Sequence, residues 1–424
     1  MLHRALKLPI AVLIAAPTLL VAGCSNSSSG GTSPGIGGSG GSSGSSSAGG
    51  SANGVVSDPG PGSLFLTASG ESLAVTGYDF PPATADDTFL VDGWVFRLDH
   101  EIVTIGNVVL WENPDTVPGD QSKHGAQVAH LAGPWAIDLH SGGPLTGEGG
   151  PPEQALPFAA ISARDDGTAF DTTVRYGFGF DSLPATATAT QVNLDADGQS
   201  DYEFMVSNGY SVLYVGTVSR PDPDACAKVG GTAYDFTTLP TTLKFRLGFS
   251  TPTSYVNCQN GSEFSGVKGV NGEDYQRGIQ FRSDRSVIAQ VTVHADHPFW
   301  ESFAEGSALR FDQIAAQYVG VSNPVAILED MIGLDFTAFT DKTAKPLPMR
   351  SCVDTTFYVP QYPTGQQLHF DTLKVPVDIA GKDGSKAIRD YFEYARYTQS
   401  TQGHLNSQGL CFISRNYPSP AGGS

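Results

Sequence analysis

The chain has 424 residues, with 43 aspartates and glutamates against 24 lysines and arginines, and its formal net charge at pH 7 is −19. This acidic excess argues against nucleic acid as a partner and favours solubility and the attraction of cations. The length is sufficient for one large domain or two ordinary ones, each with a substantial core.

The first 23 residues are typical of a signal peptide. Arg4 and Lys7 flank the start of an apolar stretch that ends at Val21, and this stretch is shorter than the roughly 20 apolar residues that a membrane span needs. Its end, Val21-Ala22-Gly23-Cys24, resembles the lipobox of bacterial lipoproteins. The resemblance implies cleavage before Cys24, a lipid on that cysteine and a membrane reached through the lipid anchor. The alternative is an ordinary signal peptide that is cut after Gly23.

The segment after the cysteine predicts a tether. Ser25 stands where an aspartate would be a retention signal, so the resemblance implies the outer membrane, at its periplasmic face or the cell surface. Residues 25–54 are nearly all serine and glycine, which predicts a coil with no core. The predicted organisation is therefore a signal peptide (1–23), a lipidated cysteine with a disordered tether (24–54) and a β-rich globular body (55–424).

Alternation of apolar and polar residues dominates the body. It runs from Trp94 to Ile102, from Leu243 to Phe249 and from Val287 to Val293, separated by clusters of glycine, proline, asparagine and aspartate. These features predict a mainly β fold, an antiparallel β-sandwich or a barrel-like body. The proline-rich segment 219–224 is either an internal domain boundary or a loop within one sandwich.

Helical patterns are few. A helix from Ser385, as its cap, to about Tyr397 and another near 308–318 are predicted to pack against the sheet from outside.

The cysteines predict disulfides. Apart from Cys24 there are four, and an even number in an exported chain indicates structural pairs with three pairings open. Local closure favours Cys226 with Cys258 and Cys352 with Cys411.

A calcium loop is the most specific local signal in the body. Oxygen-bearing residues follow the spacing at which EF-hand loops begin, with a glycine at the sharp turn. The predicted ligands are Asn193, Asp195, Asp197, Gln199 and Asp201. The rest of the segment departs from the EF-hand pattern. Phe204 stands where a bidentate glutamate is expected, and Tyr202–Val206 favours a strand instead of the exiting helix. The loop therefore predicts a structural calcium site bracing a hairpin, or else an Asp/Gly turn that caps its own backbone.

A second metal signal lies at the end of the strand predicted over Val287–Val293. His294 and Asp296 project from the face opposite the apolar residues, and His297 precedes a proline that ends the strand. Two imidazoles and a carboxylate within four residues are suitable ligands for a copper- or zinc-type ion. The alternative is a polar network that joins the strand end to a neighbouring helix, through Asp312.

A closed site needs a ligand from elsewhere in the chain. His124, His130 and His140 are the predicted partners of His294, and convergence within about 5 Å would test them. His100 falls on an apolar strand face, where a hydrogen-bonded core histidine is the favoured interpretation.

These observations favour a non-catalytic, metal-binding extracytoplasmic lipoprotein as the function. The first alternative is a metal-dependent hydrolase, in which a zinc-type ion on His294, Asp296 and His297 activates water. The second is an adhesion or carbohydrate-binding sandwich that uses exposed aromatic rings. The sequence names no catalytic residue, and no protein or glycan partner.

Overall fold

The structure is a computed structural model. It describes residues 56–84, 87–140, 143–222, 226, 233–264, 273–302, 307–353, 377–378 and 387–415. The predicted signal peptide, Cys24, the tether and Ser385 lie outside the described residues. Contacts divide the chain into Met1–Ser47 and Ala48–Ser424, and the fold below concerns the second unit.

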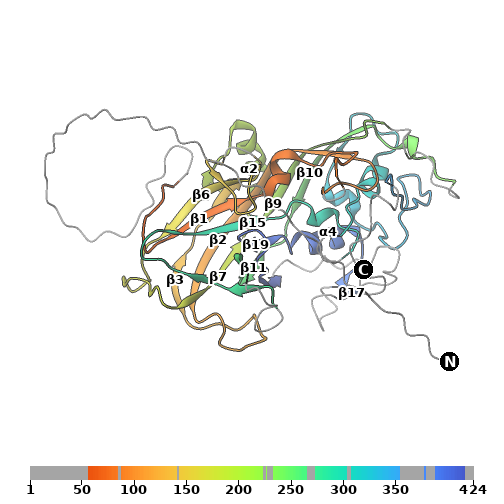
Figure 1. The fold of residues 1–424 in the computed structure, drawn as a ribbon. Helices are drawn as coiled ribbons and strands as arrows, with labels where there is room; N and C mark the ends of the chain where they lie inside the picture. The colour runs from red at the N-terminus through yellow and green to blue at the C-terminus, as the bar shows by residue number, and fades with distance from the viewer. Residues whose placement is uncertain are drawn as a thin grey trace, which may run out of the picture. The chain divides into compact units, whose positions relative to one another are not determined.

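A five-stranded sheet carries the strand that precedes His294. In spatial order its strands are β19 (Gly403–Leu405), β15 (Val287–Val293), β1 (Leu64–Ser69), β6 (Gln154–Ile161) and β5 (Leu145–Thr146). Figure 1 shows β1, β15 and β19 side by side. β1 and β15 are parallel, with Ser69 opposite Thr292, so the residues that follow both strands meet at one end of the sheet. β19 is antiparallel to β15 and places His404 opposite Thr292.

An eleven-stranded sheet forms the rest of the framework. Its main path is β16 (Val325–Ala326), β10 (Thr242–Phe249), β9 (Val212–Ser219), β2 (Val95–Glu112), β7 (Arg175–Ser182), β11 (Thr253–Val256) and β20 (Phe412–Arg415). Beside this path are β3 (Gln127–Leu131), β4 (Trp135–Asp138), β8 (Thr190–Val192) and β14 (Ile279–Gln280). Two small pairs complete the strands: β12 (Gln259–Phe264) with β13 (Tyr275–Arg277), and β17 (Val377–Asp378) with β18 (Ala387–Ile388).

One hydrophobic core includes residues from both sheets. Leu66 of β1 and Val291 of β15 belong to the same buried cluster as Phe96 of β2, Phe178 of β7 and Phe245 of β10. Alternate residues of half-buried strands point to one face, which is why the period-two pattern of the sequence builds this core. The predicted fold class, mainly β with a sandwich or barrel-like body, is confirmed. Some pairs depart from the antiparallel rule, β1 with β15 among them.

Short helices accompany the sheets. The described α-helices are α1 (Glu71–Thr76), α2 (Ala196–Asn208), α3 (Asp312–Ala315) and α4 (Tyr391–Gln399). The 3₁₀ turns are η1 (Phe236–Thr238), η2 (His297–Phe299), η3 (Ala316–Tyr318) and η4 (Leu328–Met331). Both predicted helices are present in part: α4 begins only at Tyr391, after the strand β18, and ends at Gln399, and α3 covers four residues of the second prediction. The cap of α4 is Asp390, whose side chain accepts a hydrogen bond from Glu393 N. Within the described residues, no helix combines the length and apolar character that a membrane crossing requires.

A bulge in β2 changes which of its residues face the core. The register against β9 shifts between Leu98 and His100. Before it, Leu98 faces the main core, whereas beyond it Val103 does so and Ile102 packs in a separate cluster with Met205 of α2. The single apolar face predicted from Trp94 to Ile102 is therefore wrong beyond Leu98, because one extra residue reverses the alternation.

The four cysteines form two disulfides, but the pairing favoured by local closure is wrong. Cys226 is bonded to Cys352 and Cys258 to Cys411. The reason for the second pair is strand order, since β11 and β20 pair with Val256 opposite Phe412 and bring the flanking residues together. Disulfides persist in oxidising compartments, so they indicate an extracytoplasmic environment.

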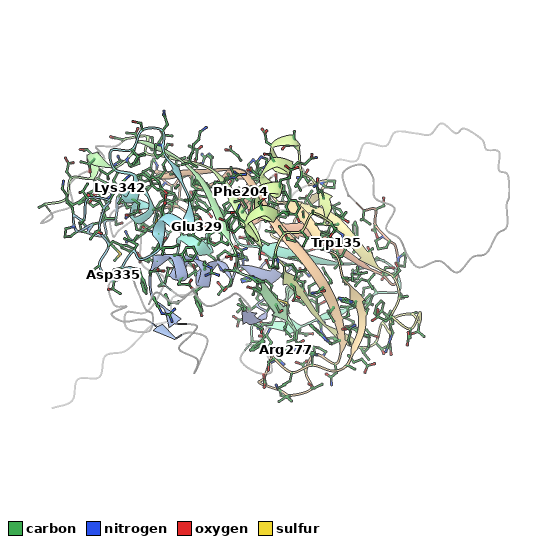
Figure 2. All side chains as sticks on the ribbon, turned by 180° about the vertical axis from the view of Figure 1, so that it is seen from behind. Trp135, Phe204, Arg277, Glu329, Asp335 and Lys342 are labelled. Carbon is green, nitrogen blue, oxygen red and sulfur yellow. A yellow bond between two sulfur atoms is a disulfide. The ribbon has the colours of Figure 1, made fainter. Side chains whose placement is uncertain are left out.

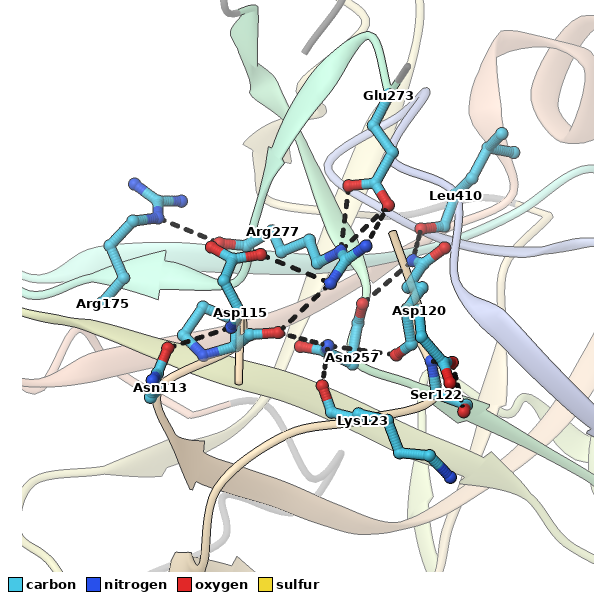
Figure 3. A network of polar contacts seen from close by, with 12 residues as sticks. Asn113, Asp115, Asp120, Ser122, Lys123, Arg175, Asn257, Glu273, Arg277 and Leu410 are labelled. Carbon is cyan, nitrogen blue, oxygen red and sulfur yellow. Dashed lines mark hydrogen bonds and ion pairs between the residues drawn. The ribbon is translucent and has the colours of Figure 1, made fainter. Parts of the chain in front are cut away.

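A polar network (Figure 3) includes Asn257 and Leu410, which precede the disulfide-bonded Cys258 and Cys411 in the sequence. The guanidinium of Arg277 forms ion pairs with Glu273 at 2.5 Å and with Asp115 at 3.3 Å. Asn257 Nδ2 donates to the carbonyl oxygens of Pro114, at 2.7 Å, and Gln121, at 3.1 Å. These bonds attach the loop between β2 and β3 to the rest of the body. Figure 2 shows Arg277 at one edge of the body, on a different side from α2, which carries Phe204.

Candidate metal centre

Three histidines gather where β15 ends beside β19. His294 follows β15, His297 begins η2 and His404 lies within β19. The ring centroids of His294 and His404 are 4.1 Å apart, those of His294 and His297 are 5.2 Å apart, and those of His297 and His404 are 5.7 Å apart. Each residue is buried, with exposed fractions of 6%, 1% and 2% for His294, His297 and His404. Buried imidazoles in mutual contact are uncommon unless they share a partner.

His297 presents an unpaired nitrogen to this cluster. Its Nδ1 lies 2.7 Å from Thr401 Oγ1, and that hydroxyl donates its own hydrogen to Thr398 O at 2.7 Å. The hydroxyl oxygen therefore accepts from Nδ1–H, which leaves the lone pair of the neutral ring on Nε2. Nε2 is buried and has no hydrogen-bond partner among the described residues. The ring also packs on Trp300, with centroids 3.7 Å apart.

Two further atoms of side chains that can bind a metal ion are also buried and unpaired among the described residues. Within the part of the chain that the structure describes, His404 Nδ1 and Asp296 Oδ1 are both buried without a hydrogen-bond partner. The other oxygen of Asp296 accepts a hydrogen bond from Trp300 Nε1 at 3.0 Å, which holds the carboxylate in place. A second contact that orients a ligand in this way is a common feature of metal sites.

His294 faces a carboxylate. Its Nε2 lies 3.1 Å from Ser407 O, and because a carbonyl can only accept, the ring nitrogen must be the donor. The lone pair of the neutral ring is then on Nδ1, which is 3.3 Å from Glu71 Oε2. When His294 is protonated this contact is an ion pair, and in the neutral ring the lone pair of Nδ1 lies beside the carboxylate. Glu71 has a φ of 61°, a backbone conformation that non-glycine residues rarely adopt and that often marks functional sites.

The ligand atoms of His294, Asp296 and His297 lie within 4.8 Å of one another. Among the described residues, this is the group of histidine, cysteine and acidic side chains that could hold a metal ion. Donor atoms bound to one zinc ion lie roughly 3–4 Å apart, so this upper limit is somewhat wider than the spacing around a bound ion. The structure thus brings together the three ligands that the sequence predicted at this strand end.

The electrostatics favour the form of histidine that binds metals. Burial lowers the pKa of His297 well below its ordinary value, and the nearby His294 and His404 add to the effect. Burial likewise lowers the pKa of His404, with His294 contributing. A neutral imidazole offers the lone pair that a metal ion needs, whereas an imidazolium does not.

The partners predicted from Lys123–Gly143 do not join this group in the described part of the chain. His124 stacks on Trp111 with centroids 4.1 Å apart, His130 Nε2 lies 3.4 Å from Asn107 Oδ1, and His140 Nδ1 lies 2.7 Å from Ala74 O. The strands next to these histidines, β3 and β4, pair with β2 in the other sheet. Asp312 is not the polar partner either, since it pairs with Arg350.

His100 is a hydrogen-bonded histidine, as the favoured interpretation held. Its Nδ1 lies 2.6 Å from Asp138 Oδ2 within the protein interior. The hydrogen bond to Asp138 raises the pKa of His100, although burial opposes it.

The residues predicted to bind calcium have other partners in this structure. Asp195 is the N-cap of α2 and accepts from Gly198 N at 2.8 Å, Asn193 Nδ2 donates to Asp138 O at 3.1 Å, and Asp201 pairs with Arg246 at 2.5 Å. Asp197 and Gln199 lie in the first turns of the helix. The strand expected at Tyr202–Val206 is wrong, because the capped start and a left-handed Gly209 at the end enclose a helix.

Sequence reasoning missed His404 and Glu71. His404 stands alone between glycine and leucine, more than 100 positions from His294, and no local pattern marks it. Glu71 is one of 43 acidic residues. Only the pairing of β15 with both β19 and β1 brings these side chains to His294.

A cleft with a volume of about 610 Å³ adjoins the cluster. Its lining includes Glu71 and Ser407, both of which contact the His294 ring, and the acidic Asp79, Asp87 and Glu153. The candidate centre is therefore buried but adjacent to an open acidic surface.

Comparisons of the chain with protein-family models, with curated proteins and with solved structures gave no match.

Proposed function

We propose that this protein is a non-catalytic, metal-binding lipoprotein that holds a zinc- or copper-type ion on His294, His297 and Asp296. His404, which the fold adds, is the fourth ligand. The observation that carries the proposal is the lone pair of His297 Nε2, which is buried, unpartnered and fixed in its tautomer by Thr401. A buried polar atom without a partner costs about 1–3 kcal/mol, and a metal ion at this point would remove that cost.

The donor set favours these ions over calcium or magnesium. Imidazole nitrogens with one carboxylate suit zinc and copper, while calcium and magnesium prefer oxygen ligands. We do not extend the proposal to calcium at Asp195, Asp197 and Asp201, because the side chains of Asp195 and Asp201 are engaged with the backbone and with Arg246.

The location is part of the proposal. A lipid on Cys24 and the serine- and glycine-rich tether would hold the body outside the cytoplasm, at the outer membrane. The two disulfides support an oxidising extracytoplasmic compartment.

The experiment measures metal content after loading the purified full chain with Zn²⁺ and, separately, with Co²⁺, whose absorption spectrum reports the ligands. We expect one tightly held ion in the wild type and its loss in His297→Ala and in His404→Ala. His124→Ala and His130→Ala are matched controls, since their rings contact other partners. Unchanged metal content in His297→Ala, or equal losses in the controls, would contradict the proposal.

A metal-dependent hydrolase is the second candidate, and the cleft beside His294 favours it. In such an enzyme the metal-bound water would attack a substrate lying in the cleft, with the ion as Lewis acid. Hydrolysis of ester and phosphoester substrates that depends on Zn²⁺ and is lost in His297→Ala would support this candidate. A loaded protein without such activity leaves the non-catalytic proposal in place.

A further inference from the structure

The imidazole of His294 connects the acidic cleft with the other two histidines. On the cleft side, Ser407 O lies 3.1 Å from its Nε2 and Glu71 Oε2 lies 3.3 Å from its Nδ1, and both of these residues line the cleft. On the other side, the ring centroid of His404 is 4.1 Å away and that of His297 is 5.2 Å away. An ion that reaches His294 from the cleft has therefore arrived at the cluster.

The cleft lies at the end of the five-stranded sheet where β15 ends. Glu71 and Ser72 belong to α1, which follows β1, and residues 149–153 come just before β6. Since β1 is parallel to β15 and antiparallel to β6, the end of β1, the end of β15 and the start of β6 meet at one edge. Segments that are distant in the sequence thus form the wall of the cleft beside His294.

Hydrogen bonds within the protein hold the wall in place. Glu153 accepts from Gly149 N at 2.8 Å and from Gln290 Nε2 at 2.7 Å. Ser407 N donates to Thr292 Oγ1 at 2.9 Å. Because these bonds are made without an occupant, the cleft of about 610 Å³ is already formed and is large enough for a hydrated ion.

The charge of the wall attracts cations. Among the described residues that line the cleft there are four acids and no lysine, arginine or histidine; the acids are Glu71, Asp79, Asp87 and Glu153. Arg97, from outside the lining, pairs with Asp79 and offsets one of these charges. A cleft with one sign of charge raises the local concentration of ions of the opposite sign and the rate at which they bind.

We propose that this cleft is the route by which the metal ion enters and leaves the histidine site, and that Glu71 binds the ion on its way to His294. The inference rests on the proposed function, because a route needs a site at its end. It adds that the bound ion is exchangeable. The protein takes up a hydrated divalent cation from its surroundings and releases it again, instead of keeping it as a permanent structural ion.

The first test obstructs the cleft with Ser72→Trp. Stopped-flow mixing measures zinc uptake by the metal-free full chain and zinc release to an excess of chelator. An obstruction raises one barrier that both directions share, so both rates should fall by the same factor, of about fivefold or more, while the affinity stays unchanged. Thr88→Trp obstructs the cleft from another segment of its lining and should act in the same way.

Ser207→Trp is the matched control. Ser207 is also a helical serine, on α2, but it is exposed and is not among the residues that line the cleft. Zinc uptake and release should proceed at the wild-type rates in this variant. Thermal melting of each metal-free variant verifies folding.

The second test removes the charge of Glu71. Glu71→Gln should slow zinc uptake about tenfold at low ionic strength, and the dependence of the uptake rate on salt should become weaker. His404→Ala gives the contrast, because loss of a ligand speeds release and leaves the uptake rate unchanged.

The route is overturned if folded Ser72→Trp and Thr88→Trp exchange zinc at the wild-type rates, or if Ser207→Trp slows exchange equally. Faster release from Ser72→Trp would also contradict it, since an obstruction cannot speed release. Wild-type uptake by Glu71→Gln would remove the role of Glu71. Failure of the wild type to bind zinc is a different result, because it removes the histidine site itself.

Discussion

The Arg277 network and the histidine cluster are both buried polar groups within one β-rich body, but they balance their charges differently. In the network, the guanidinium of Arg277, only 1% exposed, lies between the carboxylates of Glu273 and Asp115 (Figure 3). In the cluster, His297 Nε2 and His404 Nδ1 are buried and lack hydrogen-bond partners among the described residues. The first arrangement pairs its charges within the protein, whereas the second leaves buried polar atoms unpaired among the described residues.

The difference distinguishes structural polar groups from candidate ligands. A buried pair such as Arg277 and Glu273 holds segments together, and removing one partner is costly. Unpaired atoms such as His297 Nε2 contribute no stability as they stand, and they are tolerated where a ligand pairs with them. Substitutions in either the paired or the unpaired group should therefore have different effects on stability and on metal binding.

The largest effect is expected from Arg277→Met. It leaves Glu273 and Asp115 without their cation, and breaking a buried pair costs about 3–5 kcal/mol. We expect the lower end of this range in urea unfolding, because Asp115 is partly exposed, and metal binding should not change. Arg285→Met, which breaks the exposed pair with Asp284, should have little effect. A loss of metal in Arg277→Met would contradict the separation of the two clusters.

Asp92 is a buried carboxylate with only one of its two oxygens hydrogen-bonded. We expect it to make the stability of the protein depend on pH. Its Oδ2 accepts hydrogen bonds from Phe311 N and Asp312 N, but its Oδ1 has no hydrogen-bond partner among the described residues. Burial, and then the charge of Asp312, raise its pKa from 3.8 to about 7, although Arg310 and Arg350 oppose the shift.

Between about pH 4 and 7 the folded state therefore holds a proton on Asp92 that the unfolded state has released, so stability falls as pH rises. Relative to Asp92→Asn, the wild type should lose up to about 1.4 kcal/mol per pH unit in this interval. Urea unfolding of both proteins at several pH values measures the difference. Parallel pH profiles would show that Asp92 does not titrate in this way.

A substitution at Thr401 tests whether this hydroxyl fixes the His297 ring for metal binding. Thr401→Val removes the acceptor that fixes the His297 tautomer, and loss of such an outer contact lowers metal affinity by about 10–100-fold. Competition with a coloured chelator measures the affinity for Zn²⁺. Thr401→Ser should restore binding, whereas a purely structural role would leave the affinity of Thr401→Val unchanged once folding is matched.

The smallest effect is expected at Asp195, the cap of α2. Asp195→Ala should reduce the free energy of unfolding by about 1 kcal/mol, because Gly198 N loses its acceptor. The loss should be the same with excess Ca²⁺ and with a chelator. A loss seen only with Ca²⁺ would restore the calcium interpretation of this segment.

Parts of the fold and of the site were predictable from local patterns. The alternation over Val287–Val293 coincides with β15, and it placed His294, Asp296 and His297 at a strand end because side chains alternate between faces. The bulge after Leu98 could not be foreseen, since an extra residue in one strand is defined by its partner strand. The role of Asp195 could not be decided from the sequence either. An aspartate followed by a glycine can begin a calcium loop or cap a helix, and here it caps α2.

The sequence by itself determined the β-rich class, the presence of two disulfides and the three metal-type ligands that are neighbours along the chain. The tertiary structure decided which cysteines pair, which histidine completes the cluster and which residues of β2 face the core beyond its bulge. The physical reason is that local patterns record the direction of a side chain relative to its own strand. The meeting of His404, Glu71 and His294 depends on strand order and register, which arise only when β1, β15 and β19 pair.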